Sequence, residues 1–198
     1  MSFRLEKKYR LTMSDQKILK TLLINKGLSE LYPPRTINSC YLDNTAFECF
    51  YDSDEGSLPR KKIRLRWYDN DKELFKEVKF SSIEGRFKTS DKINNQTFLF
   101  DFKYNFFDKD YGLLSPVLIV RYIREYYLLK GVRITFDSNI SYTDLRGSFR
   151  RTLNDPETVM EIKSPNHISD DYLENLVNIP TTRFSKYCRG ILLIDNMA

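Results

Sequence analysis

Charged and apolar residues alternate in several short segments of this chain. The charged positions are Arg4, Glu6 and Lys8 in residues 3–11, Lys62, Arg64 and Arg66 in residues 60–68, Glu77 and Lys79 in residues 73–80, and Glu161 and Lys163 in residues 158–164. Side chains of a β-strand point alternately to its two faces, so each segment predicts a strand with one charged and one apolar face. One such row is typical of a solvated sheet face, but four rows favour a shared charged surface.

The opposite positions of these strands are apolar, as Ile63, Leu65 and Trp67 are in the second segment. We therefore predict that the apolar rows pack outward against helices and that the charged rows line a wet interior. A dry interior is excluded because burying so many unpaired charges would be prohibitive. Lys7 interrupts the apolar row of the first segment.

The remaining hydrophobic pattern completes the set of expected elements. It predicts strands over residues 36–43, 84–89, 116–129 and 132–140, and helices over residues 14–26, 169–177 and 183–194, with a short helix or turn at 45–52. Ser14 is the expected start of the first helix and Gly27 its stop. In residues 90–115 the phenylalanines fit either element, and we favour a helix. The predicted fold class is α+β, a closed eight-stranded antiparallel β-barrel with flanking helices, built as a single domain over residues 1–198.

Composition narrows the class of protein. The chain has 198 residues, 41% of them hydrophobic, and a net charge of +5, which suits an anionic ligand at a focused site. The basic N-terminus lacks the apolar run of a signal peptide and no segment predicts a membrane span, so we expect a cytoplasmic protein. Three cysteines without CxxC spacing and a single histidine, His167, argue against a zinc site or a Ser-His-Asp triad.

The residues expected on the charged surface are mostly cations. They are Arg4, Lys8, Lys62, Arg64, Arg66, Lys79, Arg124, Arg133, Lys163 and Lys186, against Glu6, Glu77 and Glu161. Such an excess favours a polyanion, because the planar guanidinium matches phosphate oxygens. The carboxylates suit Mg²⁺ or Mn²⁺, which take one or two of them together with water and substrate phosphates. The chain has no GxxxxGKS phosphate loop, so phosphate binding would be by side chains.

These segments resemble a known family. RLEKKYRLT, SCYLDN, RKKIRLRWY, FKEVK, VRYIREYY, VRITFD, VMEIK and FSKYCRG follow one another as in the VTC domain, the polyphosphate polymerase domain of the vacuolar transporter chaperone. That domain belongs to the triphosphate tunnel metalloenzyme (CYTH-like) superfamily. The resemblance spans nearly the whole chain and implies an eight-stranded tunnel.

The resemblance also implies roles for particular residues. Lys8, Arg64, Arg66, Lys79, Arg124 and Arg133 would bind the phosphates of ATP and of a growing polyphosphate chain, with Arg4, Lys62 and Lys163 beside them. Glu161 would bind the metal, usually Mn²⁺, with Glu6 and Glu77 as further candidates. Ser185 and Lys186 match a Ser-Lys pair that touches phosphate. The catalytic set would be Lys8, Arg64, Arg66, Lys79, Glu161 and Lys186. The superfamily motif Glu-x-Glu-x-Lys has Arg4 in its first position here, which argues against a two-metal hydrolase.

Several activities are compatible with a basic, phosphate-binding tunnel of this kind. The leading hypothesis is a polyphosphate polymerase that uses ATP. The alternatives are a triphosphatase or tripolyphosphatase of the same fold, and a domain that only binds polyphosphate or inositol polyphosphates. Nucleic-acid binding is the least favoured, because the cations lie on strands rather than in a basic cluster with interleaved aromatic residues. The chain carries none of the membrane or regulatory domains of the fungal complexes, so we expect any such partner to be a separate protein.

Overall fold

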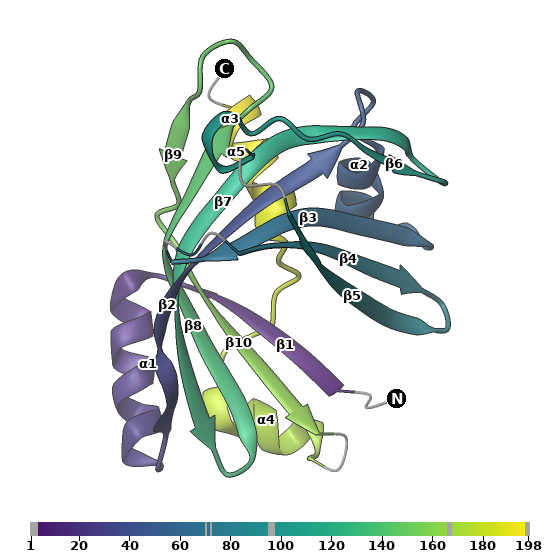
Figure 1. The fold of residues 1–198 in the computed structure, drawn as a ribbon. Coiled ribbons are helices and arrows are strands. Elements are labelled where there is room, and N and C mark those ends of the chain that lie inside the picture. Colours follow the sequence, from purple (N-terminus) through teal and green to yellow (C-terminus); the bar gives the residue numbers. More distant parts are fainter. Residues whose placement is uncertain (1–3, 70, 72, 95–97, 166–167, 197–198) are drawn as a thin grey trace. The chain divides into compact units, whose positions relative to one another are not determined.

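The computed structural model describes residues 4–69, 71, 73–94, 98–165 and 168–196 (Figure 1). His167 therefore lies outside the described residues. The strands are β1 (Arg4–Leu11), β2 (Ser29–Asp43), β3 (Arg60–Tyr68), β4 (Leu74–Ser82), β5 (Gly85–Ile93), β6 (Phe106–Asp108), β7 (Gly112–Leu129), β8 (Val132–Asp144), β9 (Thr152–Asn154) and β10 (Thr158–Pro165). The helices are α1 (Met13–Asn25), α2 (Glu48–Glu55), α3 (Phe98–Asp101), α4 (Asp170–Val177) and α5 (Lys186–Asp195).

The strands form one sheet with the order β1-β10-β8-β7-β2-β3-β4-β5, to which β6 is added at β7 and β9 at β8. The registers of β1 with β10, β10 with β8, β2 with β3, β3 with β4, and β4 with β5 are all antiparallel. This confirms the α+β class and the antiparallel sheet. A closed barrel needs a further pairing between β1 and β5, and the order formed by the described residues stops at these two strands. Closure of the barrel therefore stays a prediction.

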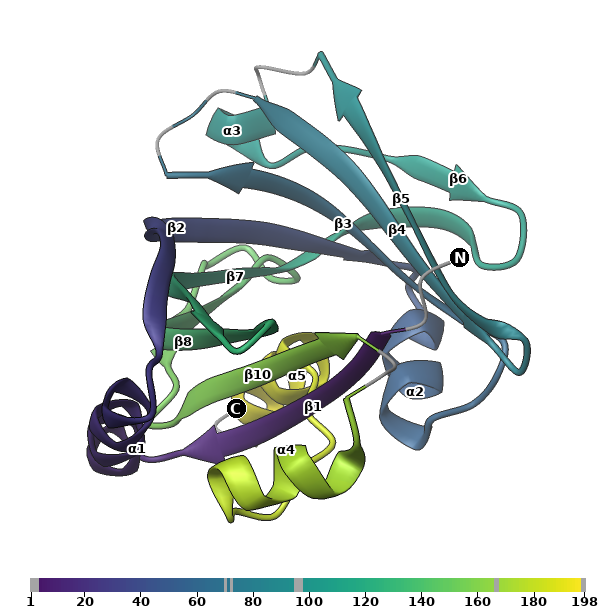
Figure 2. The ribbon, with the colours of Figure 1, turned by 90° about the horizontal axis from the view of Figure 1, so that it is seen from below.

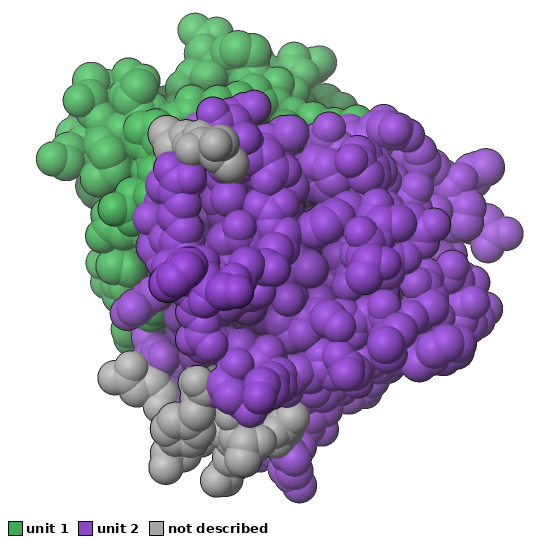
Figure 3. Space-filling model, turned by 90° about the horizontal axis from the view of Figure 1, so that it is seen from above, with its two compact units in different colours: residues 1–36, 122–140, 154–184 green, residues 37–121, 141–153, 185–198 purple. Residues whose placement is uncertain are grey.

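The chain divides into two compact units (Figure 3). Unit 1 comprises residues 1–36, 122–140 and 154–184, and unit 2 comprises residues 37–121, 141–153 and 185–198. Four boundaries fall inside β2, β7, β8 and β9, and the fifth lies between Phe184 and Ser185, just before α5. The single-domain organisation expected from the sequence stays a prediction.

The core of unit 1 lies between strands and helices. Helices α1 and α4 lie beside β1 and β10 (Figure 2). Tyr9 and Leu11 of β1 are buried together with Leu19 and Leu23 of α1, and side chains of β10 and α4 join the same cluster. The apolar row of β1 thus packs against helices, as the alternating pattern predicts. Lys7 interrupts that row, and its ammonium is paired there, 3.1 Å from Asp170 and 3.2 Å from Glu174 on α4.

The core of unit 2 lies on the apolar side of β3. Ile63 and Leu65 are fully buried there, in one cluster with Phe98 of α3 and Leu114 of β7. Trp67 continues the same row, partly buried, with its ring edge-on to Phe98 at 6.2 Å between centroids. Burying this row leaves Lys62, Arg64 and Arg66 on the opposite face of β3.

Helix α5 approaches the sheet of unit 2 closely at a glycine. A Cβ atom at Gly190 would lie 2.5 Å from Cδ1 of Tyr142 and 2.7 Å from Cδ2 of Leu118. Such distances are shorter than any van der Waals contact, so only glycine fits. The absence of a side chain at position 190 therefore sets how closely α5, and the residues at its start, approach β7 and β8.

Three local expectations need correction. Helix α1 is capped by Thr12 rather than Ser14, since the Thr12 hydroxyl accepts the backbone N–H of Asp15. Strand β2 begins at Ser29, seven residues before the expected start at 36. Among the described residues of 90–115, the helix covers Phe98–Asp101 alone, while residues 90–93, 106–108 and 112–115 belong to β5, β6 and β7. Phe98, Phe102 and Phe106 pack in one core cluster, and their spacing fits either periodicity, whereas Phe107 is exposed.

Candidate functional site

The predicted charged positions of β3 and β4 lie on one face of unit 2, together with a residue of β5. Lys62 lies directly opposite Lys79 on β4, and Lys79 lies directly opposite Lys88 on β5. Directly opposed residues of antiparallel strands share a face, and like charges in that arrangement destabilise a sheet. We call this surface the cationic face and define it by Lys62, Arg64, Arg66, Lys79 and Lys88, with Glu77 among them. Lys92, further along β5, forms its own ion pair with Glu73.

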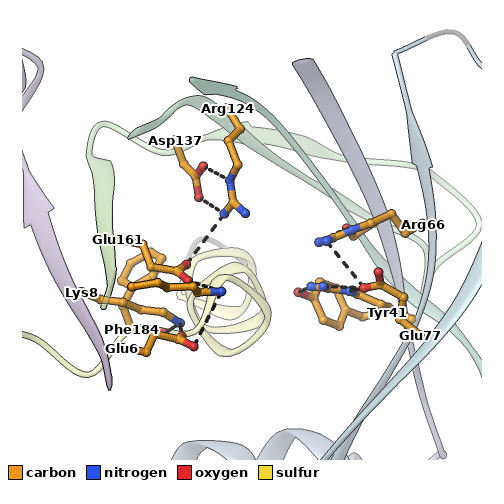
Figure 4. Close-up of polar contacts among 12 residues, drawn as sticks. Glu6, Lys8, Tyr41, Arg66, Glu77, Arg124, Asp137, Glu161 and Phe184 are labelled. Carbon is orange, nitrogen blue, oxygen red and sulfur yellow. Dashed lines mark hydrogen bonds and ion pairs between the residues drawn. The ribbon is translucent and has the colours of Figure 1, made fainter. Parts of the chain in front are cut away.

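Glu77 is the buried carboxylate of the cationic face. Its Oε2 accepts a hydrogen bond from Nε of Arg64 at 2.8 Å and lies 3.5 Å from Nη1 of Arg66, while its Oε1 accepts from Nζ of Lys88 at 2.6 Å (Figure 4). Burial alone would raise the pKa of this carboxyl, but Arg64 and Arg66 outweigh burial and lower the pKa to about 2. Glu77 is thus ionised and holds three cations in place, and its metal-ligand role stays a prediction.

The two arginines of β3 are fixed by neutral partners on β2. Arg66 is largely buried and donates from Nε and Nη2 to the hydroxyl of Ser39, at 3.1 and 3.0 Å. Arg64 donates from Nη1 to the hydroxyl of Tyr41 at 3.0 Å. Both guanidiniums are therefore oriented before any ligand arrives, and neither neutral contact reduces their charge.

Helix α5 begins beside the cationic face. Ser185 caps the helix by accepting the backbone N–H of Cys188, and its hydroxyl also accepts a hydrogen bond from Nζ of Lys62 at 2.9 Å. Lys186 is the first residue of the helix. The predicted Ser-Lys pair therefore lies at a helix N-terminus, where free N–H groups and the helix dipole favour an anion.

The predicted residues of unit 1 form a second cluster. Lys8 on β1 lies opposite Glu161 on β10, and Glu6 lies opposite Lys163. Nζ of Lys163 lies 2.6 Å from Oε1 of Glu161 and 3.8 Å from Oε2 of Glu6 (Figure 4). Nζ of Lys8 lies 3.3 Å from Oε1 of Glu6 and donates to the carbonyl oxygen of Phe184 at 3.1 Å.

Strands β7 and β8 add an arginine and an aspartate to this cluster. Arg124 donates from Nε and Nη2 to the two oxygens of Asp137, at 2.6 and 2.7 Å, and its Nη2 lies 3.9 Å from Glu161. Burial alone would raise the pKa of the Glu161 carboxyl, but Lys163 and Arg124 hold that pKa well below its usual range. We define the balanced cluster as Glu6, Lys8, Arg124, Asp137, Glu161 and Lys163, because each cation in it has a carboxylate partner.

The balanced cluster fits a divalent cation. Two carboxylates, Glu161 and Glu6, converge on one positive charge, the ammonium of Lys163, and Glu161 is ionised. The hydroxyl oxygen of Thr135, directly opposite Glu161, is buried without a hydrogen-bond partner. No group of three or more His, Cys, Asp or Glu side chains is close enough to form a metal site within the part of the chain that the structure describes. Mg²⁺ and Mn²⁺ need only one or two carboxylates when phosphates and water complete the shell, so the donor set is sufficient.

The structure places the other predicted residues as follows. Arg133 lies on β8 directly opposite Lys163. Arg4 begins β1, and its side chain lies outside what the structure describes. Lys186 and Lys79 belong to unit 2, whereas Lys8 and Lys163 belong to unit 1.

Sequence reasoning missed four polar residues. Asp137 lies two and four residues after Thr135 and Arg133 on β8, and Ser39 and Tyr41 lie two residues apart on β2. The alternation of side chains along a strand could therefore have predicted which face these residues occupy. Lys88 lies in a strand that is exposed on both faces and has no apolar row, so the sequence does not show which face Lys88 occupies. Asp137 and Glu77 hold arginines, a role that only their contacts reveal.

The family follows from comparison with known proteins. The VTC domain matches residues 3–194. This chain belongs to the VTC domain family. A comparison with curated protein sequences finds no significant match.

Solved structures share the fold at low sequence identity. A Pyrococcus horikoshii protein is 15% identical with a TM-score of 0.57, and the match covers 98% of this chain and 99% of the other. A candidate adenylate cyclase from Bacillus halodurans is 9% identical with a TM-score of 0.56, covering 92% and 95%. A Hippeastrum protein described as having a dominant triphosphatase activity is 15% identical with a TM-score of 0.53, covering 95% of each chain. These likenesses establish a CYTH-like fold. No helix among the described residues is long and apolar enough to cross a membrane.

Proposed function

We propose that this VTC domain is a metal-dependent polyphosphate polymerase that transfers the terminal phosphate of ATP to a growing polyphosphate chain. One observation carries the proposal: the cationic face brings five cations onto one side of β3, β4 and β5, and the Glu77 carboxylate contacts three of them. Lys62, Lys79 and Lys88 lie in register across three strands, so the face carries more positive charge than the Glu77 carboxylate balances and favours a polyanion. A triphosphate is an anion of sufficient charge, and it can contact several cations at once.

The cationic face would act by binding and orienting. Arg64 and Arg66 would hold neighbouring phosphate groups, while Lys62, Lys79 and Lys88 neutralise the remaining charge. In phosphoryl transfer the charge spreads over the equatorial oxygens, and fixed cations stabilise that charge without reorganising. Glu77 keeps the two guanidiniums in place through the contacts described above and is a positioning residue.

The balanced cluster would supply the metal site. Glu161, with Glu6 beside it, would hold Mn²⁺ or Mg²⁺, which when bound polarises phosphoryl oxygens. In this arrangement Lys163, Lys8, Arg124 and Arg133 bind phosphate oxygens, and Asp137 orients Arg124. The side chains of these lysines and arginines are long, so each can leave a carboxylate partner and contact a phosphate oxygen instead.

The start of α5 would bind an acceptor or terminal phosphate. Its free N–H groups and Lys186 favour an anion, and Lys62 already contacts Ser185. Lys186→Ala should therefore reduce chain synthesis more than ATP binding. This residue separates polymerase from hydrolase chemistry, because only the polymerase needs a second phosphate chain as acceptor.

A second candidate is hydrolysis of triphosphates. It is favoured by the likeness in fold to the Hippeastrum protein that is described as having a dominant triphosphatase activity. The same cations serve both reactions, since water then replaces the acceptor phosphate. A domain that only binds polyphosphate is the third outcome.

One experiment distinguishes the three. Purified protein is incubated with ATP and Mn²⁺, and the phosphate is separated into long chains and orthophosphate. Long chains support the polymerase, and orthophosphate alone supports the hydrolase. Neither product, together with tight polyphosphate binding, would leave a binding domain. Lys79→Ala should reduce whichever product forms, whereas Lys76→Ala is the matched control, because Lys76 lies on the other face of β4 beside the Phe106 ring.

A further inference from the structure

Tyr41 places a phenol hydroxyl among the arginines of the cationic face. The residue lies on β2 directly opposite Arg64, which donates a hydrogen bond to the hydroxyl oxygen at 3.0 Å. The phenol has one proton of its own to donate. Among the side chains that the structure describes, none accepts that proton from Tyr41. A hydroxyl that is buried among cations and has its oxygen occupied is a donor available for an anion.

The ring of Tyr41 cannot turn easily away from this position. It stacks on the ring of Tyr187 with 4.8 Å between centroids and 11° between planes. Tyr187 in turn donates its hydroxyl proton to Asp43 at 2.5 Å, and Asp43 also accepts backbone N–H groups of Cys49 and Phe50 at the start of α2. Three elements therefore hold the phenol in one orientation, which favours a ligand contact over a packing role.

We propose that the Tyr41 hydroxyl donates a hydrogen bond to a phosphate oxygen of the bound triphosphate and thereby makes binding sensitive to alkaline pH. The inference rests on the proposed function, because it assigns a further ligand contact to the same surface. It adds a neutral donor to a site otherwise built from permanent cations.

Electrostatics give the hydroxyl its pH sensitivity. Burial alone would raise the pKa of Tyr41, but Arg64 and Arg66 outweigh burial and lower the pKa to about 8. The other charged or titratable groups that face this region are Lys62 on β3, Glu77 on β4, Lys88 on β5, and Asp43 and Tyr187 behind the ring. Glu77 is ionised throughout this range, and burial raises the pKa of Tyr187 far above it.

The sign of the effect follows from the two protonation states. Below about pH 8 the phenol is neutral and donates to phosphate. Above that value it becomes a tyrosinate, which has no proton to donate and repels the ligand. Triphosphate affinity should therefore fall by up to about tenfold per pH unit as pH rises above the pKa of Tyr41. Reciprocally, bound triphosphate should raise that pKa toward its ordinary value.

The test uses the full chain and inorganic tripolyphosphate in metal-free buffer, with affinity measured by calorimetry across neutral and alkaline pH. Tyr41→Phe keeps the ring and its stacking but removes the hydroxyl. We expect roughly ten- to hundredfold weaker binding at neutral pH and a shallower alkaline decline than in the wild type. Tripolyphosphate itself titrates equally in both proteins, so the difference between their profiles isolates the phenol. Tyr51→Phe on the exposed side of α2 is the control.

A second measurement does not depend on the variant. Tyrosinate absorbance of the wild type, followed during alkaline titration, should show one low-pKa phenol that moves upward when tripolyphosphate is added. Equal affinity and an equal alkaline decline in Tyr41→Phe, or a titration that ignores the ligand, would overturn this inference alone. A wild-type protein that binds no tripolyphosphate at any pH would overturn the proposed function as well.

Discussion

The cationic face and the balanced cluster are built from the same sequence pattern, yet their charges combine differently. On β3, β4 and β5 the register places Lys62 opposite Lys79 and Lys79 opposite Lys88. On β1 and β10 the register places Lys8 opposite Glu161 and Lys163 opposite Glu6, although Arg133 of β8 lies opposite Lys163 on its other side. Alternation along a strand decides which face a charge occupies, but pairing across strands decides whether it is neutralised. Register therefore separates a surface that needs an anion from one that can hold a metal.

The comparison predicts that the largest effect on activity lies in the balanced cluster. Glu161→Gln removes the charge that a divalent ion requires and leaves the side chain's size unchanged. Turnover with Mn²⁺ should fall roughly 100- to 1000-fold, while nucleotide affinity measured without metal should change little. Glu157→Gln is the matched control in the same unit, because Glu157 pairs with Arg10 away from the cluster. An unchanged Mn²⁺ dependence in Glu161→Gln would move the metal to Glu6 or Glu77, and a metal at Glu77 would remove the distinction between the two clusters.

Acid should weaken the fold through the buried carboxylate of the cationic face. The folded-state pKa of Glu77 lies at about 2, below its ordinary value of 4.5. Its contribution is therefore complete above about pH 4.5 and is lost as pH falls toward 2, by at most about 3 kcal/mol. Unfolding by denaturant at a series of pH values measures this loss. Glu77→Gln should be less stable at neutral pH and should show a flatter acid limb; an acid limb identical to the wild type would contradict the assignment.

Arginine on the cationic face should matter for binding more than for stability. Arg64→Ala should weaken ATP binding roughly ten- to hundredfold, since a charge-assisted contact to phosphate is lost. Stability should fall by less than in Glu77→Gln, because Arg66 and Lys88 still contact the Glu77 carboxylate. Arg121→Ala, an exposed arginine of unit 2, serves as the control in the same binding titration. Normal ATP affinity in an Arg64→Ala, Arg66→Ala double variant would show that this row does not face the ligand.

The smallest expected effect is on stability, and it compares a lysine of the cationic face with a lysine of the balanced cluster. Lys79→Ala removes the middle member of three opposed lysines, so without ligand it should stabilise the protein by about 0.2–1 kcal/mol. Lys163→Ala removes the partner of two carboxylates and should destabilise it. Chemical denaturation of both variants in low salt measures the two signs. Destabilisation of similar size in both would mean that the cationic face is neutralised within the protein itself.

The face that most of these charged residues occupy could be predicted from sequence, because side chains alternate between the two faces along a strand. The apolar rows of β1 and β3 marked Tyr9 and Ile63 as core, and the opposite rows then located Lys8 and Arg64. Register could not be predicted in the same way, since it is fixed by packing across strands. The contact of Lys163 with Glu6, and the assignment of Asp137 to Arg124, therefore required the structure.

The local errors have equally physical causes. Thr12 and Ser14 are both good helix caps, and the choice depends on which hydroxyl meets a free backbone N–H group. The aromatic residues around Phe98 fill a core cluster of unit 2 from a four-residue helix and from β6, so their spacing fits two periodicities. In both cases tertiary contacts, not local preference, decide the outcome.

The close approach of α5 to the sheet at Gly190 makes the start of the helix sensitive to mutation at a position that contacts no proposed ligand. The residue has no polar side chain and touches no proposed ligand, yet any larger residue there would push α5 off Tyr142 and Leu118. Ser185 and Lys186 would move with the helix. A random-mutagenesis screen for lost phosphate chemistry should therefore recover substitutions at position 190 about as readily as substitutions of the basic residues themselves. Such substitutions would identify a residue that positions the start of α5 without contacting the ligand.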